Sequence, residues 1–123
     1  MAVPKSVIPD AELDVLKVLW GEQSLTARDL AERLYENANP SSMGTVQKLI
    51  ARLEEKEFIR RDRKDATHRF SAAVTREEVA GLQLEELAGK LYEGSLSPFV
   101  LHLLQGKRLS KKEKDDIRRL LDE

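Results

Sequence analysis

The sequence predicts a mainly α-helical protein with a small β wing formed by one hairpin. Apolar residues recur with helical spacing in six segments, and two short extended runs flank a charged turn near the middle of the chain. Of the 123 residues, 41% are hydrophobic and 35% are charged, with few Gly and Pro, which is typical of helices that expose charged faces. Cys is absent, which excludes disulfides and thiolate metal sites and fits a reducing compartment.

Two helices are predicted before residue 40. Residues 10–20 place apolar side chains on one helical face, and Gly21 is expected at the C′ position that ends this helix. An extended link over residues 25–29 follows. Within it, Thr26 and Asp29 have the spacing of a capping box, which predicts the start of a second helix. The turn-forming residues 37–40 end that helix.

A complete amphipathic pattern over roughly residues 43–56 predicts a third helix. We expect Ser41 or Ser42 to cap its start. The apolar stripe of this helix consists of Val46, Leu49, Ile50 and Leu53. Its opposite face is polar and partly basic, and it comprises Gly44, Thr45, Gln47, Lys48, Ala51, Arg52 and Glu55.

The hairpin is predicted from residues 58–62 and 67–71, which flank the charged tip at residues 63–66. Ile59 and Phe70 are expected to face inward. Three helices followed by a two-stranded hairpin is the element order of a winged helix-turn-helix. We therefore predict such a domain over residues 1–75.

Residues 76–123 are predicted to form three more helices, two of which begin at the capping boxes Thr75–Glu78 and Ser110–Glu113. A segment this short rarely buries enough apolar surface to fold alone. Two copies of it could complete each other's core, or one copy could fold back on the winged helix as a monomer. The first alternative predicts a homodimer with these contact residues: Leu87, Leu91, Tyr92, Phe99, Val100, Leu103, Leu104, Ile117, Leu120 and Leu121.

The charge is unevenly distributed although the formal net charge is only −1. Residues 42–76 carry nine Lys or Arg against five Asp or Glu, whereas both flanking segments are acidic. A local basic patch of this kind suits binding to nucleic-acid phosphates. A winged helix that binds a partner protein is the alternative interpretation, and the basic middle segment argues against it.

The third helix is the predicted reader of the major groove, because base contacts usually lie near the N-terminal end of such a helix. There Gln47 can pair with adenine, and Lys48 can reach guanine or a phosphate. Thr45 can meet a thymine methyl group, and Gly44 permits close approach of the backbone to DNA. The residues expected to contact phosphates are Ser41, Ser42, Arg52, Arg60, Arg63, Lys64, His68 and Arg69.

The chain also resembles a known family over about residues 7–122. The segments TVQKLIARLEEKEFI and KLYEGSLSPFV are similar to the recognition-helix and dimerisation segments of the penicillinase and methicillinase repressors, the BlaI/MecI type. This resemblance implies a winged helix, a helical dimerisation region over residues 76–123, and repression at palindromic promoters by a homodimer. The double-stranded operator would have dyad symmetry.

The resemblance further implies how repression ends in the antibiotic-responsive members. There a membrane metalloprotease sensor detects a β-lactam, and the repressor is cut in its dimerisation region by that sensor or a downstream protease. The cleaved bond aligns with His102–Leu103, although the Asn–Phe pair of those members is absent here. The Cys-rich tail of the related copper-responsive repressors is also missing, so we expect no metal sensing.

Other functions find no support in the sequence. There is no Gly-rich phosphate loop, no HExxH motif and no nucleophile–base–acid spacing, so we expect neither an enzyme nor a cofactor or metal site. His68 and His102 are lone histidines, for which structural roles are expected. No apolar run approaches the length of a membrane span, and residues 1–8 lack the apolar stretch of a signal peptide, so we expect a cytoplasmic protein.

Overall fold

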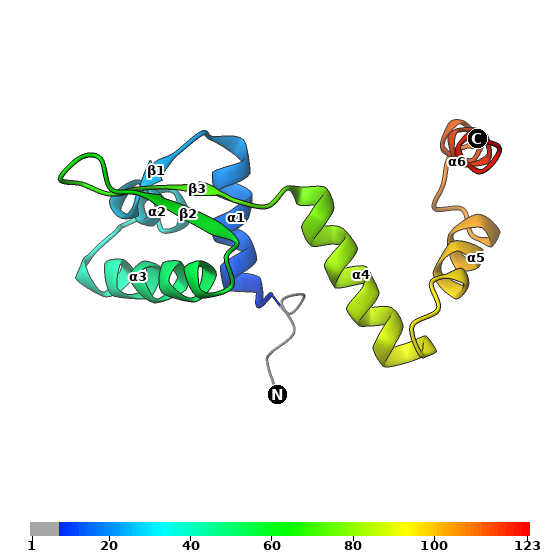
Figure 1. Ribbon diagram of the computed structural model, residues 1–123, viewed down its shortest axis with the longest axis horizontal. Coiled ribbons are helices and arrows are strands. Elements are labelled where there is room, and N and C mark those ends of the chain that lie inside the picture. Colours follow the sequence, from blue (N-terminus) through cyan, green and yellow to red (C-terminus); the bar gives the residue numbers. More distant parts are fainter. Residues whose placement is uncertain (1–7) are drawn as a thin grey trace. The chain divides into compact units, whose positions relative to one another are not determined.

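The computed structural model describes residues 8–123 and confirms a mainly helical fold with a small sheet (Figure 1). By internal contacts the chain divides into two compact units, one ending at Gln83 and the other comprising Leu84–Glu123. The elements in chain order are α1 (Asp10–Gly21), β1 (Leu25–Thr26), α2 (Ala27–Leu34), α3 (Pro40–Glu55), β2 (Ile59–Asp62), β3 (Arg69–Ala72), α4 (Arg76–Tyr92), α5 (Ser97–Gln105) and α6 (Lys111–Leu121).

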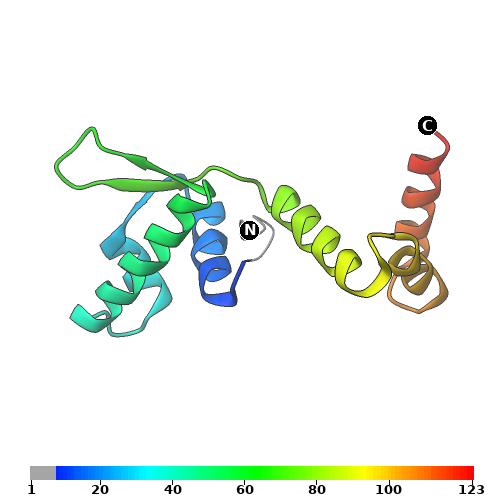
Figure 2. The same cartoon turned by 60° about the horizontal axis from the view of Figure 1, so that its bottom comes forward.

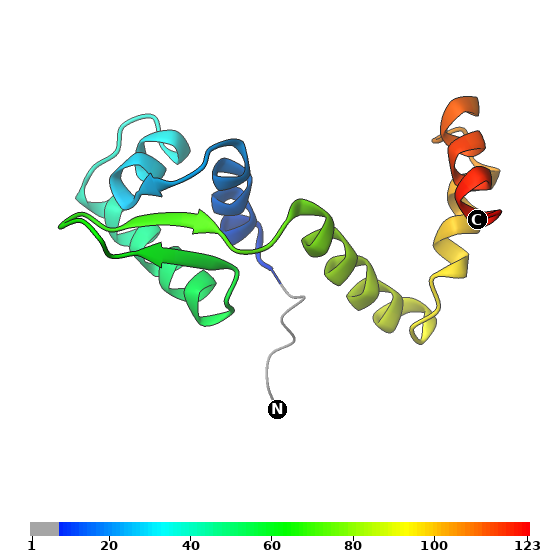
Figure 3. The same ribbon diagram turned by 45° about the horizontal axis from the view of Figure 1, so that its top comes forward.

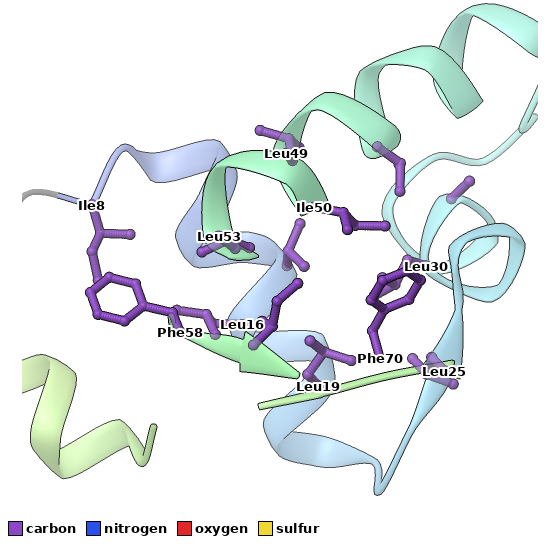
Figure 4. Close-up of a cluster of buried hydrophobic side chains, with 14 of the residues drawn as sticks. Ile8, Leu16, Leu19, Leu25, Leu30, Leu49, Ile50, Leu53, Phe58 and Phe70 are labelled. Carbon is purple, nitrogen blue, oxygen red and sulfur yellow. The ribbon is translucent and has the colours of Figure 1, made fainter. Parts of the chain in front are cut away.

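The N-terminal unit is built around one apolar core that α1, α2, α3 and the sheet share (Figure 4). The predicted stripe on α3 is confirmed, because each of its four members is at most 5% exposed. Ile59 and Phe70 face inward as predicted, and Phe58 joins them. Burial of one face of α3 fixes which of its side chains remain in solvent.

The sheet has three antiparallel strands in the order β1-β3-β2. The hairpin of β2 and β3 is as predicted, whereas the third strand, β1, was not predicted. Leu25 pairs with Phe70 and Thr26 pairs with Arg69, so the link before α2 satisfies its backbone by joining the sheet. A strand of two residues has no periodicity that a sequence could reveal. The hairpin loop projects beyond the three helices (Figures 1 and 2).

Three predicted helix ends are wrong. The α2 helix ends at Leu34 with Tyr35 as its cap, before residues 37–40. The α3 helix begins at Pro40, and its cap is Asn39, whose side chain accepts a hydrogen bond from the Ser42 amide at 2.9 Å. Ser41 and Ser42 therefore lie in the first turn, since Pro tolerates the first helical position, where an N–H lacks an intrahelical partner. Gly21 is the last residue of α1 and not its C′ residue, because the extended cap residue is Glu22.

The three predicted capping boxes are confirmed. Thr26 and Asp29 exchange hydrogen bonds at the start of α2, and the boxes Thr75–Glu78 and Ser110–Glu113 begin α4 and α6 in the same way. Each box satisfies two backbone donors at a helix start. These three starts were predictable because a capping box is a local pattern.

The C-terminal unit has almost no core of its own. Ala88 is the one buried apolar residue between 84 and 123, all of which the structure describes. Tyr92 and Phe99 form an edge-on aromatic pair with ring centres 5.1 Å apart, which joins the end of α4 to α5. Most other large apolar side chains of the unit face solvent. Among residues 8–123, no helix is long and apolar enough to cross a membrane.

Candidate nucleic-acid interface

The solvent face of α3 carries the predicted reading residues. Gly44, Thr45, Gln47, Lys48 and Arg52 are all exposed, while the stripe on the other side of the helix is buried in the core. A Cβ atom built at Gly44 would meet nothing within 4 Å, so the chain itself leaves open space there. The face is thus polar, positively charged and exposed to solvent.

The N-terminus of α3 offers fewer free donors than the sequence suggested. Pro40 has no N–H, and the Asn39 side chain accepts from both the amide and the hydroxyl of Ser42, at 2.9 and 3.4 Å. The Thr45 hydroxyl donates to the Ser41 carbonyl at 3.2 Å. The Ser41 amide therefore remains as the first-turn donor for a phosphate, together with the exposed Ser41 hydroxyl.

An open hollow of about 310 Å³ lies between α2, α3 and the hairpin. It brings Gln47 of α3 next to residues of the wing tip and of the α2 N-terminus. The residues that line it are Thr26, Ala27, Arg28, Met43, Gln47, Arg61, Ala66, Thr67, His68 and Phe70. The hollow connects the predicted reading face with the predicted wing contacts. It also adds Arg28, whose side chain is 82% exposed and which was not among the predicted contacts.

The tip of the wing exposes two cations. Arg63 and Lys64 are both exposed, and Arg60 on β2 is exposed as well. The Lys64 amide donates to an Asp62 carboxylate oxygen at 2.9 Å, which stabilises the turn that carries both tip cations.

The two other predicted wing contacts have partners inside the unit. The Arg69 guanidinium donates to the hydroxyl and the carbonyl of Ser24 at 3.0 and 2.9 Å, which ties β3 to the segment before β1. The His68 Nδ1 atom lies 3.1 Å from the Arg61 guanidinium. Both side chains are half-buried, and part of their hydrogen-bonding capacity is used internally.

An ion pair between α3 and β2 was not foreseen. Arg61 donates from Nε and Nη2 to the two carboxylate oxygens of Glu54, at 2.9 and 2.6 Å. Its guanidinium also lies 4.8 Å from the centre of the Phe70 ring. The hydrogen bond from Arg61, opposed in part by burial, holds the pKa of Glu54 below its ordinary value. No local sequence pattern distinguishes Glu54 from the neighbouring Glu55.

This pKa shift predicts a pH dependence of stability. A carboxylate whose pKa is lowered on folding stabilises the protein above its unfolded pKa, and this contribution is lost as the pH falls through the folded pKa. We therefore expect Glu54→Gln to lower the urea midpoint at pH 7 and to lose much of that effect well below the ordinary value of 4.5. The matched change Glu55→Gln, at an exposed neighbour, should have little effect at either pH.

A second unforeseen pair lies at the other side of α3. The Lys56 ammonium is 2.7 Å from a carboxylate oxygen of Glu12 on α1, and the Glu12 side chain is only 2% exposed. The two residues are 44 positions apart, so nothing in the local sequence predicts their contact. The pair fixes the C-terminal end of α3 to the first helix of the unit.

Most of the predicted dimer contacts are exposed on the C-terminal unit. Leu91 is 61% exposed and Leu121 is 76% exposed, and Leu87, Tyr92, Val100, Leu103 and Leu120 are also exposed. Phe99, Leu104 and Ile117 are half-buried. His102 and Leu103 lie within α5, so the bond between them is part of a regular helix.

The chain is similar to proteins of one known family over most of its length. The model of the family described as "Penicillinase repressor" matches residues 8–123. The penicillinase repressor of Staphylococcus aureus is 27% identical, covering 100% of this chain and 97% of the relative. The transcriptional regulator BlaI of Mycobacterium tuberculosis is 31% identical, covering 93% of this chain and 82% of the relative.

Two further proteins are also similar to this chain. The methicillin resistance regulatory protein MecI of Staphylococcus aureus strain N315 is 24% identical and covers 94% of this chain and 93% of its own length. Among solved structures, the reduced form of MarR from E. coli is 20% identical with a TM-score of 0.47, over 94% of this chain and 76% of that chain.

Proposed function

Because this chain belongs to the penicillinase repressor family, whose members are transcriptional repressors and not enzymes, we propose that it represses by binding operator DNA as a homodimer. The operator is double-stranded DNA with dyad symmetry, so that each protomer reads one half-site. In this proposal residues 1–75 bind DNA and residues 76–123 join the protomers.

The observation that carries the DNA-binding proposal is the exposed polar face of α3 beside a cationic wing tip. The helix is anchored by its buried stripe, so Gln47 and Lys48 can enter a major groove while the core stays intact. Arg63 and Lys64 on the tip can then meet the phosphate backbone. In the same proposal Ser41, Ser42, Gly44, Thr45, Arg52, His68 and Arg69 complete the interface.

The exposed leucines of α4–α6 support the homodimer. A surface on which residues as apolar as Leu91 and Leu121 are more than half exposed needs a partner. The segment 84–123 buries only Ala88 among its apolar residues, so a second copy of the same segment can supply the missing core. Such an interface, in which the same residues of both protomers meet around a two-fold axis, would also set the spacing of the two α3 helices on DNA.

The test is a titration of the purified full-length chain with the DNA upstream of its own gene, combined with sedimentation. We expect a dimer at micromolar concentration and an affinity that drops by orders of magnitude between about 50 and about 200 mM salt, as expected for about six or more phosphate contacts. A monomer that binds no DNA at low salt would overturn the proposal. DNA-independent capture of a partner protein would point to the protein-binding alternative.

The dimer is tested separately by Leu91→Glu. This change places a charge in the proposed interface, so we expect dissociation to monomers at micromolar concentration. Operator affinity should decrease by about 100-fold or more, because two linked half-site contacts become independent. The measurements are sedimentation velocity and fluorescence anisotropy. Gln105→Glu adds the same charge at an exposed polar position of α5 and should leave the oligomeric state and the operator affinity unchanged.

We propose that release from DNA follows a cut in this same C-terminal region. A cut at His102–Leu103 would remove the end of α5 and all of α6 from the interface. Because the bond lies in a helix, α5 must unfold locally before a protease can accept it. The proposed protease is a membrane metalloprotease sensor or a protease that it activates. N-terminal sequencing of the repressor fragments from induced cells tests this proposal. An intact repressor chain in cells whose promoter is derepressed would refute it.

A further inference from the structure

The cations of the basic middle segment do not all face solvent, and Arg61 differs from its neighbours. Arg60, Arg63 and Lys64 are exposed, whereas the Arg61 side chain is 25% exposed and engaged with other side chains. It has a two-pronged pair with Glu54, with N–O distances of 2.9 and 2.6 Å. A phosphate contact by Arg61 would have to compete with that pair.

The contacts of Arg61 join three different parts of the N-terminal unit. Glu54 belongs to the last turn of α3, Arg61 to β2, and Phe70 and His68 to β3 and the residue before it. The β2 strand lies against α3 after a short turn, in which Glu57 has a positive φ of 64° (Figure 3). Arg61 thus links the reading helix to both arms of the hairpin.

The hairpin needs such a link because its tip has few other constraints. Residues 63–67 are all exposed, and the loop projects away from the core. A two-pronged Arg–carboxylate pair fixes orientation as well as distance, which a single contact does not. The angle between the wing and α3 decides whether the tip reaches the backbone when α3 lies in the groove.

We infer that Arg61 and Glu54 are positioning residues for DNA binding, which hold the wing at the angle where Arg63 and Lys64 meet the phosphate backbone. This inference rests on the proposed DNA-binding function and adds to it residues that touch no DNA. Removing a negative charge near DNA should by itself strengthen binding. Glu54→Gln is instead expected to weaken it.

The experiment measures operator affinity by fluorescence anisotropy on the full-length dimer, with the DNA upstream of its own gene. We expect Glu54→Gln to weaken binding by about tenfold and to make the salt dependence shallower by about one unit for each phosphate that the wing no longer reaches. Arg61→Met should act likewise, and Arg61→Lys should recover part of the affinity, because it keeps the charge without the two-pronged geometry. Glu55→Gln is the matched control and should leave affinity equal or slightly higher.

A double-mutant cycle separates positioning from general loss of stability. In an Arg63→Ala, Lys64→Ala background the tip cations are absent, so Glu54→Gln should change affinity by less than about twofold. An equal loss in both backgrounds would overturn the inference, and so would an unchanged affinity of Glu54→Gln. A wild-type chain that binds no DNA would refute the proposed function instead. Melting curves verify that each variant is folded at the assay temperature.

Discussion

Replacing Lys48 and Arg52 together with alanine is expected to weaken operator binding by about 100-fold or more, because it removes four side chains of the proposed reading faces from the proposed dimer, each worth about 1 kcal/mol or more. Both side chains lie on the exposed face of α3 and outside the core, so folding should be preserved. The salt dependence should become shallower, since fewer counterions are released. Anisotropy titrations at several salt concentrations measure both quantities.

The control for this pair is Lys107→Ala with Arg108→Ala. It removes the same two charges from exposed positions outside the helices. We expect it to retain most of the affinity, because it lies outside the proposed interface. If the Lys48 and Arg52 variant bound as tightly as the wild type, α3 would not be the reading helix. Sedimentation must show that both variants keep the oligomeric state of the wild type.

Lys56→Met is expected to destabilise the N-terminal unit by about 3 kcal/mol or more, because it leaves the carboxylate of Glu12 buried without its ammonium partner. The distance of 2.7 Å and the 2% exposure of the Glu12 side chain make this the most strongly desolvated of the ion pairs described in residues 8–123. The measurement is the free energy of unfolding in urea at pH 7. The melting temperature should decrease by about 10 °C or more.

The double variant Glu12→Met, Lys56→Met should regain much of the lost stability. A buried pair replaced on both sides leaves no unmatched charge, and such replacements are often close to neutral. Lys17→Met on the exposed side of α1 is the matched control and should alter stability by less than about 0.5 kcal/mol. Equal stability of Lys56→Met and wild type would mean that water already solvates Glu12.

Most helices were predictable because their cause is local. The stripe on α3 repeats every three or four residues, and the capping boxes at Thr26, Thr75 and Ser110 depend on residues three positions apart. The start of α3 was missed because Asn39 and Pro40 are equally typical of a turn that ends a helix. The β1 strand was missed because its two residues are fixed by β3, which lies far along the chain.

The candidate interface was predictable in its exposed part only. Exposure of Lys48 follows from the burial of the opposite stripe, which the period of the helix determines. The partners of Arg61 and Arg69 depend on how the hairpin folds back. The sequence alone does not show which basic residues of this segment pair inside the unit and which stay exposed. Arg69 was accordingly predicted as a phosphate contact, and the structure gives its guanidinium two hydrogen bonds to Ser24. Whether it also reaches DNA stays a prediction.

The empty space above Gly44 has a consequence for how this repressor could acquire new operators. A glycine inside a helix costs about 1 kcal/mol relative to alanine, and nothing within 4 Å in the protein requires it there. Larger side chains can therefore be introduced at this position without disturbing the fold. If α3 reads DNA as proposed, each would alter the shape that the protein presents to a base pair, so target preference can change at one site while stability is kept or improved.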